Sequence, residues 1–281
     1  MGQAIDTVVG TVTAPGAAIT ATVAATGDSF AVRNTDPGKG IWLLSAWASN
    51  NVSGVLRIRS PRLHDNVQGI RTQVLAATPL PAISHFPVQR LYPQDVLTVE
   101  LSGSAVGGQI ESAILSLYYE DLPGVAARLM SVDDLQRRGV NVLTVEVDIT
   151  PGVGGGYTGA GALNKTVDVL KANTDYALLG GTLSGTVGAV TIKGADSGNL
   201  RQAIPGLATH PQLTRDWFFR LATFSRLPLI PIFNSANKAG TTIEGVQTQA
   251  GTAFNVSLNL VELAPAGAGA TLMPGSTTPG R

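Results

Sequence analysis

Short runs of alternating apolar and polar residues predict that this chain is built from β-strands. In residues 55–59, one valine and two arginines fall on one face, while Leu56 and Ile58 fall on the other. Residues 41–47 are apolar at nearly every position, which is typical of a strand buried on both faces. Turn-forming residues separate such runs about every 8–12 residues, a spacing typical of β-sandwiches and jelly rolls.

The second half of the chain repeats the strand pattern of the first half. Residues 53–59 resemble 187–193, residues 66–68 resemble 199–201, residues 79–83 resemble 228–232, and residues 113–117 resemble 256–260. Because the order is kept, we interpret the two halves as copies from an internal duplication. The sequence therefore predicts an all-β fold with two tandem jelly-roll-like β-sandwich modules, at residues 29–122 and 141–263.

A short helix is predicted between the two modules. Its apolar residues recur at helical spacing and form one stripe: Val125, Leu129, Val132 and Leu135. Gly139 is placed to end it, so residues 123–140 are assigned as a helical linker that packs across the modules. Residues 216–224 fit two interpretations, an aromatic-rich strand or a second short helix.

The two ends of the chain predict extended arms. Residues 1–28 are rich in threonine and valine with a turn at Pro15, and residues 264–281 are rich in alanine, glycine and proline. A tail of the second composition cannot fold alone. We expect both arms to contact neighbouring subunits, which adds contact area at an ordering cost of about 1–2 kcal/mol per residue.

Composition limits the possible functions. Of the 281 residues only 14% are charged, and the net charge is zero. Few charges fit either a large sandwich with serine- and threonine-rich faces or a surface that neighbouring copies cover. A chain without basic excess offers no electrostatic support for general nucleic-acid binding. The absence of cysteine excludes disulfides and thiolate chemistry, and neither a signal peptide nor a membrane-spanning segment is expected.

Glycine-rich segments come closest to a nucleotide-binding motif. Residues 152–159 follow a predicted strand, but a dinucleotide fingerprint must open a helix, and no helical period follows. Residues 159–166 approach a phosphate-binding loop, but Asn164 stands where that loop needs glycine. We therefore expect no cofactor.

Candidate catalytic and metal-binding residues are sparse. His64, His85 and His210 have no second ligand at metal spacing, and Asp133 and Asp134 fit a solvated helix surface. The Gly-x-Ser-x-Gly pattern of a hydrolase nucleophile does not occur. We expect no catalytic, cofactor-binding or metal-binding residues, and we expect that the protein is not an enzyme.

Basic residues concentrate in the first module, at Arg57, Arg59, Arg62, Arg71 and Arg90. The simplest interpretation is ordinary solvated surface. Two alternatives stay open: contacts with acidic patches of neighbouring subunits, and a face turned toward packaged nucleic acid.

In architecture and composition, residues 11–263 resemble bacteriophage-like capsid proteins of the double jelly-roll or tandem β-sandwich kind. The resemblance implies a major capsid protein in the virion, assembled in the host cytoplasm, whose barrels stand side by side. Its partners would be copies of itself, as a trimer or larger assembly, and other virion proteins, with weak or indirect nucleic-acid contact.

Two alternatives to a capsid protein stay open. The first is a receptor- or carbohydrate-binding tail or appendage protein made of tandem β-sandwich modules, which exposed aromatic residues on one face would favour. Trp42, Trp47 and Trp217 instead lie in apolar runs typical of a core. The second is a hydrolase on a β scaffold, which would need carboxylates converging in a cleft.

Overall fold

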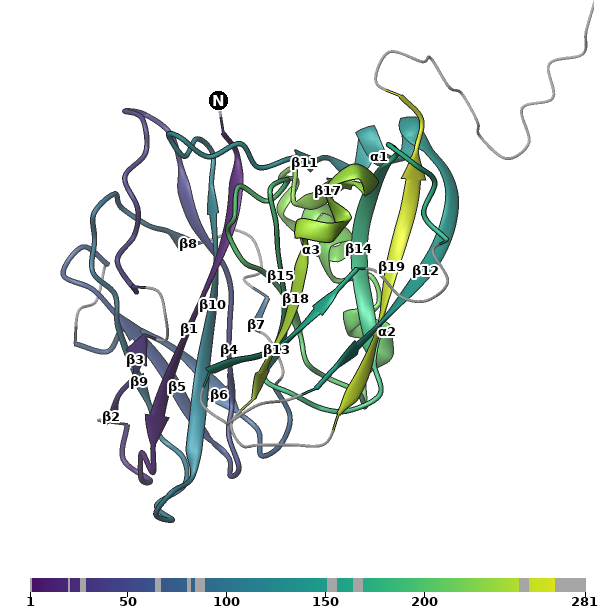
Figure 1. Cartoon of the computed structure of the whole chain (residues 1–281). Helices are drawn as coiled ribbons and strands as arrows, with labels where there is room; N and C mark the ends of the chain where they lie inside the picture. Colours follow the sequence, from purple (N-terminus) through teal and green to yellow (C-terminus); the bar gives the residue numbers. More distant parts are fainter. Residues whose placement is uncertain are drawn as a thin grey trace, which may run out of the picture.

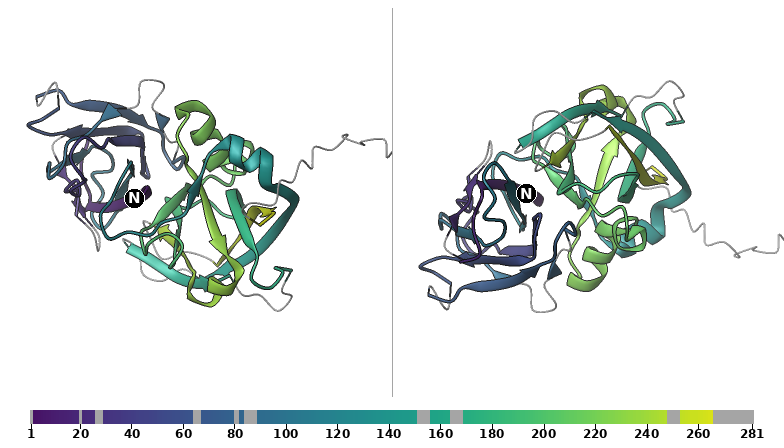
Figure 2. Two further views of the ribbon diagram at one scale, coloured as in Figure 1. Left: turned by 90° about the horizontal axis from the view of Figure 1, so that it is seen from above. Right: turned by 90° about the horizontal axis from the view of Figure 1, so that it is seen from below.

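Two β-sandwich modules stand side by side in the computed structural model of the protein (Figures 1 and 2). The structure describes residues 2–19, 21–25, 29–63, 67–79, 82–83, 89–150, 156–163, 169–247 and 253–265. All pairings between the named strands are antiparallel. The all-β fold class that the sequence predicts is therefore confirmed.

The first module consists of two facing sheets. Sheet 1 has the order β3-β1-β10-β4-β7, with β8 also paired to β4, and sheet 2 has the order β2-β9-β5-β6. The strands are β1 (Ala4–Thr13), β2 (Ala21–Thr22), β3 (Ala24–Ala25), β4 (Ile41–Ser49), β5 (Gly54–Arg59), β6 (Ile70–Val74), β7 (Ala82–Ile83), β8 (Gln89–Arg90), β9 (Thr98–Leu101) and β10 (Ile110–Tyr119).

The second module has two sheets and adds short helices. Sheet 3 has the order β11-β17-β14-β19-β12, and sheet 4 has the order β13-β18-β15-β16. The strands are β11 (Leu129–Met130), β12 (Gly139–Ile149), β13 (Gly156–Ala162), β14 (Asp175–Leu183), β15 (Ala189–Lys193), β16 (Gln202–Pro205), β17 (Ile230–Asn234), β18 (Thr242–Gln247) and β19 (Phe254–Leu263). The helices are α1 (Val132–Arg138), α2 (Pro211–Thr214), α3 (Trp217–Ser225) and the 3₁₀ turn η1 (Ser235–Gly240).

The strand order is the same in both modules. In sheet 1, β1-β10-β4-β7 corresponds to β12-β19-β14-β17 in sheet 3, and in sheet 2, β2-β9-β5-β6 corresponds to β13-β18-β15-β16 in sheet 4. Two four-stranded sheets connected in this way form a jelly roll. The sequence similarities fall on equivalent strands, with β5 matching β15, β7 matching β17 and β10 matching β19. A common origin of the two modules stays a prediction.

Sheet 1 is buried on both faces, because its strands carry apolar side chains at successive positions. On β10, Ala113 and Leu115 belong to the core of the first module. The intervening Ile114 and the nearby Tyr118 belong to a second cluster, which also holds the core of the second module. The same two-sided burial explains the apolar run of β4 and confirms what the sequence predicts for residues 41–47.

Residues 4–13 form β1 and not part of the N-terminal arm that the sequence predicts for residues 1–28. The strand pairs with β10 along its whole length, and residues 4–10 are all buried. The sequence does not reveal this, because a segment of threonine, glycine and valine suits an exposed arm as well as a strand. Its partner β10 also comes last in the module, so no local pattern announces the pairing.

The helix between the modules is shorter than the sequence predicts for residues 123–140. It covers only α1, where the Ser131 side chain accepts a hydrogen bond from the Asp134 amide and caps the first turn. The preceding chain is extended, because Leu129 and Met130 add a strand to sheet 3 beside β17. Leu135 packs into the core cluster of the second module.

Of the two interpretations of residues 216–224, the helix is correct. Trp217 to Ser225 form α3, whose residues Trp217, Phe218 and Leu221 are buried against the second module. The predicted C-terminal arm, residues 264–281, lies outside the described residues except for its first two positions.

Candidate assembly surfaces

The two modules are joined by polar contacts between β1, β4 and the second module. The Thr7 amide donates to the Arg201 carbonyl oxygen at 2.8 Å, and the Ala203 amide donates to the Thr7 hydroxyl at 3.2 Å. The Trp47 indole nitrogen donates to the Gly188 carbonyl oxygen at 2.9 Å. These contacts place the outer face of sheet 1 against β15 and β16 of sheet 4.

Apolar side chains fill the contact between sheet 1 and sheet 4. The outer face of sheet 1 contributes Ile5, Val9, Leu44, Trp47, Ile114 and Tyr118 to the core cluster of the second module. The Trp47 and Trp217 rings meet edge to face, with centroids 6.0 Å apart. β16 is buried at every position, since its two faces cover different cores. The contact has the composition of a permanent interface.

The contact between the modules joins two non-equivalent faces, because sheet 1 and sheet 4 occupy different places in their modules. One outer face of each module therefore lies outside the contact. The first module uses the outer face of sheet 1, and the second module uses the outer face of sheet 4. The outer face of sheet 2 therefore points away from the second module. On the other side of the molecule, the outer face of sheet 3 at β12 and β19 points away from the first module (Figure 1).

The outer face of sheet 2 carries three of the five arginines that the sequence analysis groups together. Arg57 and Arg59 bind the carboxylate of Glu100 at 2.5 and 2.7 Å, and Arg71 lies opposite Arg57 on β6. Burial alone would raise the pKa of Glu100, but hydrogen bonds from Arg59 and Arg57 outweigh burial and lower it.

The other two arginines lie elsewhere. Arg62 donates to the Pro93 carbonyl oxygen at 2.9 Å, and Arg90 lies on β8 in sheet 1. The structure therefore brings together Arg57, Arg59 and Arg71 and separates Arg62 and Arg90 from them.

The outer face of sheet 3 carries carboxylates along β12. Glu146 and Asp148 are exposed, whereas the alternate residues Val145 and Val147 are buried in the core. The Asn255 side chain on β19 donates to Asp148 at 2.8 Å. Neither carboxylate is among the sequence candidates, although the alternation along residues 139–149 places both on one face.

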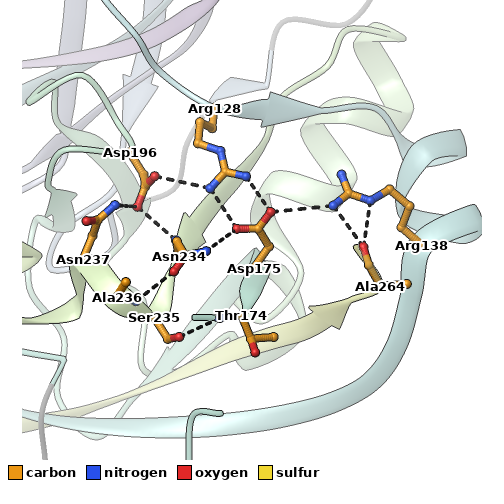
Figure 3. Close-up of polar contacts among 10 residues, drawn as sticks. All are labelled: Arg128, Arg138, Thr174, Asp175, Asp196, Asn234, Ser235, Ala236, Asn237 and Ala264. Carbon is orange, nitrogen blue, oxygen red and sulfur yellow. Dashed lines mark hydrogen bonds and ion pairs between the residues drawn. The ribbon is translucent and has the colours of Figure 1, made fainter. Parts of the chain in front are cut away.

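A polar network fixes the segment between the modules onto the second module (Figure 3). Arg128 binds Asp175 at 2.5 Å and Asp196 at 3.4 Å. Asn234 donates to Asp175 at 2.8 Å, and Arg138 lies 3.7 Å from the same carboxylate. The hydrogen bond from Arg128 lowers the pKa of Asp175, as expected for a carboxylate that ties two segments together. No local sequence pattern indicates this cluster, because Asp175 comes from β14, Asn234 from β17 and Arg138 from α1.

Replacing Asp175 with asparagine is expected to destabilise the protein at pH 7 by about 1–2 kcal/mol. The hydrogen bond from Arg128 holds the pKa of Asp175 below 3.8, with burial opposing this and Asn234 adding to it. Because the pKa of Asp175 is lower in the folded than in the unfolded state, its ionised carboxylate stabilises the fold at pH values above the unfolded-state pKa. This stabilisation is lost as the pH falls through the folded-state pKa.

The Asp175→Asn variant should therefore lose less stability than the parent chain as the pH falls from the usual aspartate pKa of 3.8 through the lower folded-state pKa. Urea unfolding across this range measures the difference. Asp133→Asn, on the exposed side of α1, is the matched control and should keep the parent's acid dependence. Equal slopes in all three proteins would contradict the assigned role of Asp175.

Glu111 is the most deeply buried carboxyl group in the described part of the chain. It is 0% exposed, and its Oε1 accepts hydrogen bonds from the amides of Ser104 at 3.0 Å and Asn51 at 3.3 Å. Its Oε2 has no hydrogen-bond partner among the described residues. Burial raises the pKa of Glu111, and the two amides only partly offset this.

We expect Glu111→Gln to be more stable relative to the parent chain at pH 8 than at pH 5. A carboxyl whose folded-state pKa is raised contributes stability below its unfolded pKa, and this is lost as the pH rises through the folded pKa. The neutral amide keeps the shape of the group without this loss. Guanidinium unfolding at both pH values tests the expectation, and a parallel shift of both proteins would contradict it.

The remaining sequence candidates do not converge. His210 precedes α2, while His64 and His85 lie outside the described residues. Residues 156–162 of the glycine-rich region form β13 and open no helix. Among the described residues, no three His, Asp or Glu side chains are grouped as metal ligands. No helix in the described ranges is long and apolar enough to cross a membrane.

No protein-family model matches the chain, and no curated protein matches it. Among solved structures it is similar to the PBSX exported protein XepA, at 12% identity and a TM-score of 0.20, over 83% of this chain and 84% of that chain. It is also similar to the major capsid protein P2 from bacteriophage PM2, at 8% identity and a TM-score of 0.20, over 94% of this chain and 99% of that chain. At this TM-score neither likeness carries an argument.

Proposed function

We propose that this chain is a structural virion protein, a major capsid protein that self-assembles into a trimer or larger particle. One observation carries the proposal. Two modules with the same strand order contact each other through unlike faces, which leaves the complementary pair of faces on opposite sides of the molecule. A subunit built in this way has surfaces available to bind further copies of itself.

In the proposed assembly, the internal contact is repeated between copies and closes into a ring. An unlike-face contact either closes into a ring or continues as a filament. Three chains contain six modules, so a ring of three presents six similar lobes. The proposed location is the virion, after assembly in the host cytoplasm, with other virion proteins as further partners and weak or indirect contact with nucleic acid. No catalytic role is proposed.

The alternative of a receptor- or carbohydrate-binding tail protein finds less support. Trp47 and Trp217 are fully buried, and Trp42 stacks on Tyr118 with ring centroids 5.6 Å apart. Tyr92, at 43% exposure, and Phe224, at 54%, are the large exposed aromatics among the described residues, and they lie on different modules. They therefore form no shared aromatic platform of the kind that binds sugars.

The oligomeric state tests the proposal directly. The full chain, purified without denaturant, is measured by multi-angle light scattering over a hundredfold concentration range and viewed by negative-stain microscopy. We expect trimers or larger closed particles. A chain that stays monomeric at the highest concentration would refute the capsid assignment.

A further inference from the structure

We propose that Glu111 keeps its proton at neutral pH and donates it to the side-chain oxygen of Asn50, and that this shared proton closes one end of the first module. The pair lies where β4 ends and β10 begins, at the lower end of the first module in Figure 1. The inference does not depend on the proposed self-assembly, because every residue that carries it belongs to one module.

Two buried acceptor atoms at this end of the module lack a donor. Glu111 is 0% exposed and Asn50 is 2% exposed. Glu111 Oε2 and Asn50 Oδ1 are both buried, and neither has a hydrogen-bond partner among the described residues. Because an unpaired acceptor is costly in a protein interior, one donor placed between these two oxygens would satisfy both.

The strand register brings the two side chains together. Ser112 pairs with Ser49, so the next residues along, Glu111 and Asn50, lie opposite each other and share a face of sheet 1. The Asn50 amide nitrogen donates to the Ser102 carbonyl oxygen at 2.9 Å. This bond fixes the orientation of the amide, since turning it over would set Oδ1 against that carbonyl oxygen.

The hydrogen bonds of Glu111 show which of its oxygens carries the proton. Oε1 accepts from the amides of Ser104 at 3.0 Å and Asn51 at 3.3 Å, so Oε2 is the oxygen left for the proton. The residues that face Glu111 are neutral, and they include Val12, which lies opposite it on β1. Burial also raises the pKa of Glu111. A protonated carboxyl is therefore the donor that these surroundings favour.

A proton fits the site better than a metal ion does. A Cβ atom at Gly103 would overlap Glu111 Oε2, so the backbone of Gly103 packs directly on the carboxyl group. Calcium takes six to eight oxygen ligands, whereas the two unpaired oxygens supply only two. A protonated carboxyl needs one acceptor, and Asn50 Oδ1 provides it.

The pair holds the loop of residues 102–104 to the rest of the module. The Gly103 amide donates to the Gly16 carbonyl oxygen at 2.7 Å, and the Gly16 amide donates to the Ser104 carbonyl oxygen at 2.9 Å. The loop thus ties the turn after β1 to β10. Ser102 and Gly103 also line an open groove of about 690 Å³, through which water reaches the carboxyl group when the loop opens.

Loss of the proton favours the open loop, because it leaves a negative charge buried without a partner. The pKa of Glu111 is higher in the closed state than in the open, hydrated state, so opening releases the proton. The equilibrium constant for opening should therefore rise about tenfold per pH unit between these two pKa values and level off above the higher one.

Carbon-13 NMR of the full chain, labelled at the glutamate carboxyl groups, tests the proposal. The signal that disappears in Glu111→Gln identifies Glu111. We expect this carboxyl group to be protonated at pH 7 and to titrate well above the usual glutamate value of 4.5. Asn50→Leu keeps the site apolar but removes the acceptor, so the titration midpoint should fall. An ionised Glu111 at pH 7, or a midpoint that does not fall in Asn50→Leu, would overturn the shared proton.

Amide hydrogen exchange at Ser104 and Asn51, corrected for the intrinsic exchange rate, measures the opening of the loop. In the parent chain the opening constant should rise about tenfold per pH unit above 4.5. In Glu111→Gln it should not depend on pH, because the neutral amide donates in place of the acid. Glu120→Gln makes the same chemical change just after the other end of β10 and should keep the pH dependence of the parent.

Exchange of the cations in the buffer separates a proton from a metal ion. Removing divalent cations with EDTA, or replacing sodium by potassium, should alter neither the titration midpoint nor the opening constant. A midpoint that moves with the cation would show that a metal ion occupies the site and would overturn the proposal. An opening constant of the parent chain that stays the same from pH 5 to pH 8 would refute the pH-dependent closure.

Discussion

Replacing Trp47 with alanine is expected to destabilise the whole protein by about 3–5 kcal/mol, the range observed for large aromatic side chains removed from a core. Trp47 is fully buried where the modules meet, its ring contacts Trp217, and its indole nitrogen satisfies the Gly188 carbonyl. The substitution opens a cavity between two cores and leaves that carbonyl oxygen without its donor. Loss of this magnitude is a large part of the stability of an ordinary domain.

Chemical denaturation followed by far-ultraviolet circular dichroism measures the effect. Trp47→Phe should fall between the parent and the alanine variant, because it keeps most of the apolar area but not the hydrogen bond. Phe224→Ala, on the exposed side of α3, is the control and should shift stability by about 0.5 kcal/mol or less. We also expect the parent to unfold in one transition and Trp47→Ala to show two, since the contact couples the modules. A denaturation midpoint of Trp47→Ala equal to that of the parent would contradict the role of Trp47 at the contact between the modules.

Strands with a clear period could be predicted from the sequence, because burial on one side of a sandwich leaves a pattern of alternate residues. The match between residues 53–59 and 187–193 predicts that β5 and β15 are equivalent, and the strand order places them at equivalent positions. The apolar run of β4 also indicated burial on both faces. It could not indicate what covers the second face, which turned out to be the other module of the same chain.

Pairings between distant strands could not be predicted. β1 looked like an arm, because nothing in its threonine and glycine content shows that β10 and β16 will enclose it. Arg57 was noted as basic, but its carboxylate partner Glu100 lies on β9 and is found only through the strand register. The partners of Asp175 could not be predicted either, because Arg128 and Asn234 come from other segments of the chain.

Gly180→Ala is expected to cost about 3 kcal/mol or more, because overpacking against rigid backbone leaves no room for relaxation. A Cβ atom at Gly180 would lie 2.3 Å from the Thr214 carbonyl oxygen, 2.6 Å from the Trp217 amide nitrogen and 2.7 Å from the Arg215 carbonyl oxygen. All three are backbone atoms of the turn that joins α2 to α3. The methyl group must therefore push this turn away from β14.

Displacing the turn links this glycine to the contact between the modules. Trp217 begins α3 and packs on Trp47, so a shift of the turn loosens the same edge-to-face pair that Trp47→Ala removes. Gly180→Ala and Trp47→Ala should consequently be less than additive when combined, since each removes part of one shared contact. Two independent sites would instead give the sum of the single effects.

Gly181→Ala is the matched control for the glycine prediction. A Cβ at this neighbouring position would lie 3.2 Å from the Ser257 carbonyl oxygen and 3.3 Å from a methyl carbon of Leu258, distances that small shifts can relieve. We expect this variant to lose less than about 1 kcal/mol, since it overpacks much less than the neighbouring substitution. Thermal unfolding of Gly180→Ala and Gly181→Ala measures the two losses of stability. The same measurement on Gly180→Ala combined with Trp47→Ala tests whether the effects are additive. If Gly180→Ala proves as stable as Gly181→Ala, the α2–α3 turn does not press on β14. The account of how α3 reaches the first module would then fail.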